Sequence, residues 1–264
     1  MKNKIALQLS EKIGNFAPEK AIILGSGLSE VANLIKPETI INYSDIKHMP
    51  QSTVSGHLGK FIFGYIENTK VVCMQGRIHL YEGYSAHQIF EIIEALSEIG
   101  VKELILTNAA GSLDINMPPA SIMLISDHIN FSGKNPLTGL SNAFVDLSNL
   151  YNEEVRTKIK QIAKANGLKL FEGTYILAEG PNFETAAEIK MFQTLGANAV
   201  GMSTVPEALS AAYLGIKVVG LSIISNFGTK MSNKTNSHEQ TLHEAAVAAK
   251  NAAVIIQQYC KGDL

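Results

Sequence analysis

The sequence predicts an α/β fold: a single domain in which a mixed, mostly parallel β-sheet is flanked by helices on both faces. Two observations lead to this prediction. Short apolar runs typical of buried strands alternate with helical patterns through most of the 264 residues, and such alternation is typical of a sheet covered by helices on both sides. No linker-like segment and no internal repeat divides the chain, so we expect one domain over residues 1–264.

The predicted strands are short apolar runs bounded by glycine or polar residues. In chain order they are residues 21–24, 61–66, 70–74, 103–107, 122–125, 174–177, 199–202 and 217–224. The second and third of these runs flank a short polar turn, which predicts a β-hairpin.

The predicted helices are marked by apolar periodicity and by capping residues. In chain order they are residues 3–14, 28–34, 86–100, 148–166, two helices that follow Thr185 and Thr204, and residues 238–260. Ser85, Thr185 and Thr204 are each followed three residues later by Gln or Glu, which is the capping-box pattern. Residues 37–59, 131–147 and 227–237 are polar or rich in glycine and are predicted loops. The second of these is long enough to suggest a functional loop and carries Phe144.

The composition is that of a well-buried globular protein with little overall charge. Hydrophobic residues make up 46% of the chain and charged residues 17%, and the formal net charge is −2. These values exclude a disordered chain and give no electrostatic reason to expect nucleic acid, so any anion site must be local. Cys73 and Cys260 lie in apolar patterns and are predicted to be buried free thiols.

We expect a cytoplasmic protein that does not associate with membranes. The first ten residues lack the apolar core and cleavage site of a signal peptide. No run approaches the roughly 20 apolar residues that a membrane-spanning helix needs.

Residues 76–84 carry the strongest chemical signal. In an extended backbone, Arg77, His79 and Tyr81 would share one face, while Ile78 and Leu80 would face the core. A guanidinium group beside an imidazole and a phenol suits an oxyanion such as phosphate. An edge strand with a solvated face is the alternative that this spacing leaves open.

Polar or glycine-rich residues follow several other predicted strands. In α/β sheets, ligands bind at these carboxyl ends of strands. If these strand ends meet at one edge, they form a pocket with an anion end made of Ser26, Arg77, His79 and Ser203. The opposite end would contain apolar Phe183 and Met202, with Glu184 and Asn226 as directional polar groups. A few fixed polar groups in an apolar cleft can orient a small planar ligand.

Several other chemistries are disfavoured. A dinucleotide-binding turn would need a third glycine where Glu30 stands, so the turn around Ser26 is either a simple tight turn or a phosphate contact. No G-x-S-x-G or P-loop motif occurs, which disfavours a serine hydrolase and a P-loop nucleotide site. No paired metal-ligand spacing occurs either, so no metal site is expected. His128 and His243 are predicted to be structural.

Eight motifs, taken together and in order, resemble the trimeric, low-molecular-mass family of purine nucleoside phosphorylases. They are residues 24–28 (LGSGL), 57–59 (HLG), 75–83 (QGRIHLYEG), 107–111 (TNAAG), 126–130 (SDHIN), 180–185 (GPNFET), 201–207 (GMSTVPE) and 225–226 (SN). The resemblance implies reversible phosphorolysis of purine ribonucleosides and deoxyribonucleosides, such as inosine and guanosine, to the free base and pentose 1-phosphate, as in purine salvage. It implies no cofactor, since orthophosphate is a co-substrate.

The resemblance also implies roles for individual residues. Phosphate would be held by Ser26, His57, Arg77, His79, the Ala109 backbone and Ser203. The ribose would be held by Tyr81, Met202 and His238, and by Phe144 from a neighbouring subunit of a homotrimer. The base would be held by Phe183, Glu184 and Asn226, and the catalytic set would be Glu184, Asn226 and His79.

The sequence departs from the family pattern in two places, and two rival functions remain. Ser225 stands where many members carry Thr, and the loop before Phe144 is short, as in the bacterial branch. Methylthioadenosine phosphorylase, a sister family, favours Asp where Asn226 stands, because a carboxylate accepts from a 6-amino group. A non-catalytic nucleoside-binding module would explain the base pocket but not the anion face of Arg77 and His79.

Overall fold

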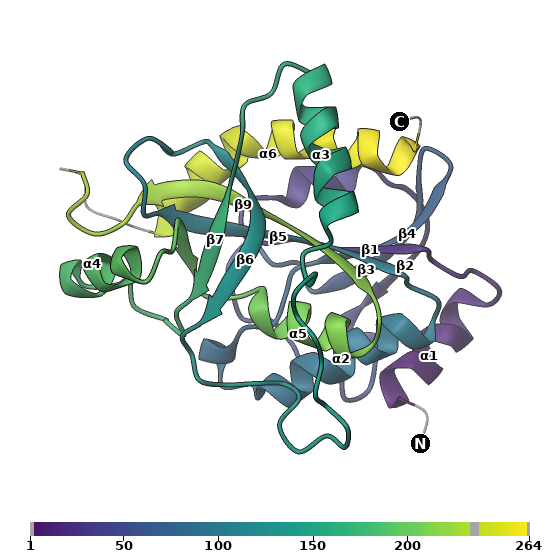
Figure 1. The fold of residues 1–264 in the computed structure, drawn as a ribbon. Helices are drawn as coiled ribbons and strands as arrows, with labels where there is room; N and C mark the ends of the chain where they lie inside the picture. Colours follow the sequence, from purple (N-terminus) through teal and green to yellow (C-terminus); the bar gives the residue numbers. More distant parts are fainter. Residues whose placement is uncertain (1–2, 233–237, 263–264) are drawn as a thin grey trace.

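The computed structural model describes residues 3–232 and 238–262, but not the side chains of residues 238–243 and 247. Within that part of the chain, one nine-stranded sheet has the order β2-β3-β4-β1-β5-β8-β7-β6-β9. Helices cover both of its faces (Figure 1). The predicted α/β fold with a mixed sheet is therefore confirmed.

The nine strands are short to medium in length and alternate with helices along the chain. They are β1 (Lys20–Ile23), β2 (Lys36–Asn42), β3 (Lys60–Ile66), β4 (Thr69–Gln75), β5 (Glu103–Ser112), β6 (Ile122–Asn130), β7 (Leu170–Leu177), β8 (Ala199–Gly201) and β9 (Lys217–Phe227). The α-helices are α1 (Lys4–Ile13), α2 (Ala86–Glu98), α3 (Glu153–Ala165), α4 (Ala186–Thr194), α5 (Val205–Tyr213) and α6 (His238–Lys261).

Part of the sheet closes on itself. Strand β5 pairs with β8 on one side and with β9 as an additional neighbour, so β5, β8, β7, β6 and β9 form a closed ring. The other four strands extend this ring as an open sheet that ends in the predicted hairpin β3–β4 and the edge strand β2. Because β5 belongs to both parts, its residues lie at the junction of ring and open sheet.

The core consists of apolar layers on the two sides of the sheet. Helices α1, α2 and α5 pack on one face, and their buried residues join the largest hydrophobic cluster. Helices α3 and α6 cover the other face, at the top of the view in Figure 1. Cys73 and Cys260 are buried free thiols, as predicted.

The main corrections concern segments predicted to be loops. Residues 37–59 are not irregular throughout, because β2 lies there and pairs with β3. Strands β5, β6 and β9 continue through the polar residues that were predicted to be turns, including Asn108 and Ser225. Neighbouring strands supply hydrogen bonds for these polar segments, and this tertiary pairing outweighs their weak strand propensity.

The helix predictions hold in part. Ser85 and Thr185 form complete capping boxes with Gln88 and Glu188. Thr204 makes no side-chain cap for α5, so the third predicted box is wrong. Residues 29–34 form a 3₁₀ helix, and the predicted helix at 148–166 begins only at Glu153.

None of the helices in the described part of the chain combines the length and the apolar character needed to cross a membrane.

Candidate functional site

One cavity of about 380 Å³ opens where the carboxyl ends of β1, β4, β5, β8 and β9 come together. Ten of the residues predicted from sequence line it: Ser26, Arg77, His79, Tyr81, Ala109, Phe183, Glu184, Met202, Ser203 and Asn226. The strand ends therefore meet as the sequence analysis predicted. The volume lies in the range of small-molecule sites, roughly 300–1,000 Å³.

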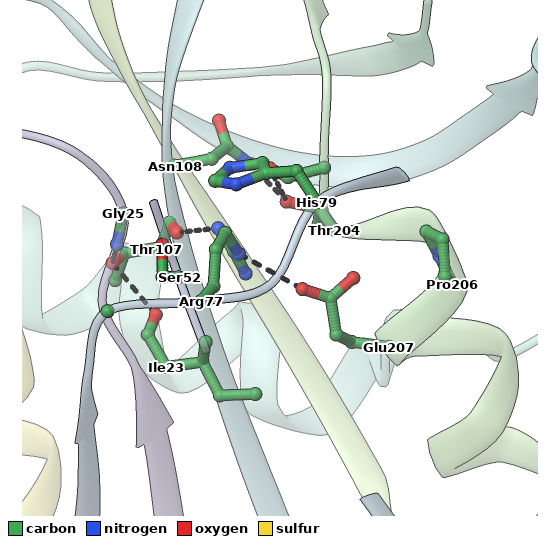
Figure 2. A network of polar contacts seen from close by, with 12 residues as sticks. Ile23, Gly25, Ser52, Arg77, His79, Thr107, Asn108, Thr204, Pro206 and Glu207 are labelled. Carbon is green, nitrogen blue, oxygen red and sulfur yellow. Dashed lines mark hydrogen bonds and ion pairs between the residues drawn. The ribbon is translucent and has the colours of Figure 1, made fainter. Parts of the chain in front are cut away.

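Arg77 is a buried cation whose side chain is fixed on two sides. Only 1% of the residue is exposed. Its Nε donates to Glu207 Oε1 over 3.0 Å, and its Nη1 donates to the carbonyl of Thr107. Figure 2 shows the guanidinium held between Thr107 and Glu207. The Nη2 group has no hydrogen-bond partner among the described residues, and a buried unpaired donor of this kind is well suited to an anion.

The grouping of Arg77, His79 and Tyr81 was predicted correctly, but the predicted extended strand was not found. Strand β4 ends at Gln75, and Leu80–Glu82 is a 3₁₀ helix. All three side chains still line the cavity. The His79 and Tyr81 rings stack with their centroids 4.6 Å apart.

The two histidines are held in a neutral state. Burial, and to a smaller extent the neighbouring His79, lower the pKa of His57 to about 4. Burial also lowers the pKa of His79 from its usual value. Both imidazoles therefore act as neutral hydrogen-bonding groups at pH 7, and Arg77 is the one cation that lines the cavity within the described chain.

Glu82 orients His79 and connects it to the loop that contains Thr53. Its carboxylate lies 3.1 Å from His79 Nδ1 and accepts from the backbone N–H of Thr53 over 2.6 Å. Burial alone would raise the pKa of Glu82, but hydrogen bonds from His79 and Thr53 outweigh it and lower the pKa to about 2. With Nδ1 facing the carboxylate, the other ring nitrogen of His79 is left for a ligand.

The glycine turn after β1 brings Ser26 to the anion end by packing directly on β5. A Cβ atom on Gly25 would lie 2.8 Å from the Asn108 Cα atom, so this close approach requires glycine. Ser26 Oγ lies 3.2 Å from His57 Nε2. His57 itself does not line the cavity and contacts the site through Ser26 and through its stacking on His79.

A β-bulge aims Asn226 into the opposite end of the cavity. The register of β5 and β9 shifts between Ala110 and Gly111, which leaves Ser225 as the extra residue. The Ser225 hydroxyl donates to Asn226 Oδ1 over 2.8 Å, and Asn226 Nδ2 donates to the carbonyl of Phe227 over 2.9 Å. With Oδ1 engaged, the second Nδ2 hydrogen is available, so Asn226 presents a donor to a ligand.

Glu184 and Phe183 come from the loop between β7 and α4. Burial raises the pKa of the Glu184 carboxyl. Phe183 is 38% exposed and forms part of the cavity wall. The neighbouring Gly180 leaves room for Met202, since a Cβ atom there would lie 2.3 Å from the Met202 sulfur.

Two residues predicted to contact the ribose are not placed in the site. Phe144 is 103% exposed and does not line the cavity of its own chain. The side chain of His238 lies outside the described residues, although α6 begins at this position.

Sequence analysis missed three residues that shape the anion end, Glu82, Thr204 and Glu207, and it placed Asn108 at a strand end in the pocket without finding its partner. The motifs that contain them were recognised, but no local pattern assigned them a function. Glu207 was predicted to cap a helix and instead pairs with Arg77, 130 positions earlier. Asn108 binds Thr204 over 2.8 Å and 96 positions. Only the tertiary structure reveals partners at such separations.

The arrangement fits an anion at one end and a planar polar ligand at the other. The described residues include no group of three or more His, Cys, Asp or Glu side chains that could hold a metal ion. Ser26 lies beside His57, but Nδ1 of His57 contacts Ser52 and the backbone of Arg77 and no carboxylate among the described residues, so a serine–histidine–carboxylate triad is not complete. Both ends belong to one cavity, so two ligands bound there would lie close together.

Comparison with known proteins identifies the family. The sequence profile described as the phosphorylase superfamily matches residues 19–261. The chain is 42% identical over 231 residues to purine nucleoside phosphorylase 1 of Geobacillus stearothermophilus, covering 86% of this chain and 84% of the relative. It is 41% identical over 255 residues to the enzyme of Bos taurus, covering 92% and 86%.

Solved structures agree. The structure of Schistosoma mansoni purine nucleoside phosphorylase in complex with inosine superposes with a TM-score of 0.91 at 34% identity, covering 98% of this chain and 95% of that one. The complex of the same protein with adenosine gives a TM-score of 0.92 at 34% identity, covering 99% and 96%. The chain therefore belongs to the phosphorylase superfamily and, within it, to the purine nucleoside phosphorylases.

Proposed function

We propose that this protein catalyses the reversible phosphorolysis of purine nucleosides and deoxynucleosides, releasing the free base and pentose 1-phosphate. The observation that carries the proposal is the buried, unpartnered Nη2 group of Arg77 at one end of a cavity whose other end holds Asn226 and Glu184. An anion and a purine fit those two ends, and the sugar then lies between them. The named relatives and the inosine complex support the same reaction.

Phosphate is held by oriented donors around Arg77. In this proposal Arg77 Nη2, the Ser203 and Ser26 hydroxyls and the Ala109 backbone donate to its oxygens. Neutral His79, whose Nδ1 hydrogen is directed at Glu82, faces phosphate with Nε2 as an acceptor, which suits a protonated phosphate oxygen. His57 acts behind Ser26, because it does not line the cavity. A site built from fixed neutral donors and one cation binds phosphate without a protein nucleophile, so phosphate itself is free to attack.

The nucleoside occupies the remaining volume. Tyr81 and Met202 contact the ribose, and His238 is proposed to do so as well. Phe183 packs on the purine, Glu184 accepts from N1–H, and Asn226 donates to O6 or N7. Glu184 and Asn226 act in catalysis because they contact the base as it leaves. His79 also acts in catalysis, through its contact with the attacking phosphate.

The rate enhancement follows from charge development. Cleavage of the glycosidic bond places positive charge on the sugar and negative charge on the base, as in other oxocarbenium-like reactions. Bound phosphate stabilises the first charge, and the Asn226 donor stabilises the second. Interactions that strengthen only in the transition state raise the rate. Holding both substrates in one cavity supplies much of the rest, and no cofactor takes part.

The first test is the phosphate dependence of inosine consumption. The purified protein should release hypoxanthine only when orthophosphate is present, with one pentose 1-phosphate formed for each base. A control at equal ionic strength with chloride in place of phosphate should show no turnover. Release of free ribose at the same rate without phosphate would indicate a hydrolase, and binding of inosine without any turnover would indicate a binding module.

The second test concerns the base. Inosine should exceed adenosine in kcat/KM by about a hundredfold or more, because adenine reverses the donor and acceptor at N1 and position 6 and each buried mismatch costs about 1–3 kcal/mol. Asn226→Asp should narrow this gap, because a carboxylate accepts from the 6-amino group.

Asn182→Asp is the matched control for this test, because Asn182 is exposed in the same loop as Glu184 and does not line the cavity. It should leave the ratio unchanged. Equal use of adenosine by the unmodified protein would contradict the proposed base site and favour methylthioadenosine phosphorylase.

A homotrimer is part of the same proposal, as are a cytoplasmic location and a role in purine salvage. The homotrimer is supported by Phe144, a fully exposed phenylalanine on the long loop 131–147. Packing of such a side chain into the nucleoside site of a neighbouring subunit would bury it.

Phe144→Ala should therefore raise the KM for inosine about tenfold or more, an effect of the size expected for losing a buried aromatic contact at an interface. Ile40→Ala, which removes another exposed apolar side chain on edge strand β2, should leave it unchanged. Sedimentation at decreasing concentration should show activity falling as the trimer dissociates. A fully active monomer would contradict this part of the proposal.

A further inference from the structure

The chain turns sharply at Thr204, between β8 and α5. Thr204 has φ 76° and ψ −48°, and the Val205 N–H donates to the Ser203 carbonyl over 2.8 Å. These values describe a γ-turn of the rare form, which is strained for a β-branched residue. Strain of this kind persists only where the surrounding structure holds it, and it is concentrated at functional sites.

The Thr204 hydroxyl does not stabilise the helix that follows it. A threonine at this position usually accepts from the first turn of the helix, but Thr204 makes no such bond to α5. Its Oγ1 instead lies 2.8 Å from Asn108 Nδ2 and 3.1 Å from Ser203 Oγ. Figure 2 shows Asn108 reaching Thr204 across the top of the site.

All three side chains are buried: Asn108 and Thr204 almost completely, and Ser203 to more than nine-tenths. Water therefore does not compete for their hydrogens, and the direction of each hydrogen bond is set by the neighbouring group.

The hydrogens along this chain can be assigned in sequence. An amide nitrogen only donates, so Asn108 Nδ2 gives a hydrogen to Thr204 Oγ1. Between Thr204 and Ser203 either hydroxyl could be the donor. Thr204 is the donor in this assignment, because its oxygen already accepts from Asn108 and Ser203 Oγ is its one other hydrogen-bond partner among the described residues. Ser203 is left with its hydroxyl hydrogen, which can point into the cavity or toward the neighbouring Tyr175 hydroxyl.

That hydrogen is the one donor that Ser203 has left for a ligand. Its backbone N–H is directed at the hydroxyl of Tyr175, 3.2 Å away. Burial raises the pKa of Tyr175 to about 12, so the phenol remains protonated and is a further hydroxyl beside Ser203. Gly201 leaves room for it, because a Cβ atom there would lie 2.4 Å from the Tyr175 oxygen.

We propose that Asn108 and Thr204 are positioning residues that orient the Ser203 hydroxyl as a hydrogen-bond donor to the attacking phosphate. This inference rests on the proposed function, because it names the anion at the Arg77 end as phosphate. If the hydrogen bonds ran in the opposite direction, Thr204 would donate to the side-chain oxygen of Asn108, and the Ser203 hydroxyl would donate its hydrogen to Thr204. Ser203 would then present a lone pair to phosphate, which repels it.

The experiment compares phosphate KM values at saturating inosine. Thr204→Val keeps the shape and removes the hydroxyl, and Thr204→Gly also removes it but adopts the turn without strain. Thr204→Ser restores the hydroxyl and is the matched control. Thermal unfolding of each variant checks that it is folded, and the glycine variant carries the test if the valine variant does not fold.

Both Thr204→Val and Thr204→Gly should raise the phosphate KM about tenfold, the size expected for one oriented hydrogen bond. Thr204→Ser should stay within about twofold of the unmodified protein, and the inosine KM should change little in all three. In a Ser203→Ala background, Thr204→Val should have almost no additional effect, because both substitutions remove the same donor.

Two results would overturn the inference. Thr204→Gly with an unchanged phosphate KM would show that the hydroxyl has no orienting role. Effects of Ser203→Ala and Thr204→Val that multiply would show that the two residues act independently. Failure of the proposed function is separate, since the unmodified protein would then show no dependence on phosphate before any variant is compared.

Discussion

The buried ion pair between Arg77 and Glu207 is the interaction on which the rest of the site depends. Removing one partner of such a pair leaves an uncompensated buried charge, at a cost of about 3–5 kcal/mol. The pair joins the segment after β4 to the first turn of α5, and the Thr107 carbonyl on β5 fixes a second side of the guanidinium. With two sides occupied, Arg77 cannot turn away, and its Nη2 group faces a fixed direction. The fold thus leaves one strong donor of a cavity-lining residue without a partner among the described residues.

In the proposed function, this arrangement would bind phosphate by orientation more than by net charge. Glu207 offsets the charge of Arg77, both histidines are neutral because burial lowers their pKa values, and Glu82 adds a negative charge nearby. The remaining affinity comes from hydrogens held in fixed directions in a site with little water, where each such bond is stronger than at the surface. The chain from Asn108 through Thr204 to Ser203 is one device of this kind, and the Ser225 contact that turns Asn226 is another.

The sequence predicted those features that depend on neighbouring residues. The capping boxes at Ser85 and Thr185 and the hairpin β3–β4 depend on residues a few positions apart, and they formed as predicted. The grouping of strand ends also held. Strands β1, β4, β5 and β9 are parallel and place their carboxyl ends at one edge, whereas β8 is antiparallel to β5 and reaches the site through its place in the ring. The functions of Thr204 and Glu207 could not be predicted, because their partners lie 96 and 130 positions away and outweigh a local capping pattern. The bulge at Ser225 likewise depends on the register between β5 and β9.

The most direct test of this account is a crystal structure of the protein with orthophosphate bound. The account predicts a phosphate oxygen within hydrogen-bond distance of Arg77 Nη2 and another within reach of Ser203 Oγ. It also predicts that Arg77 remains paired with Glu207 and Thr107. A phosphate bound away from Nη2, or an Arg77 side chain that has left Glu207 to reach the anion, would contradict the claim that the fold fixes this donor before the ligand arrives.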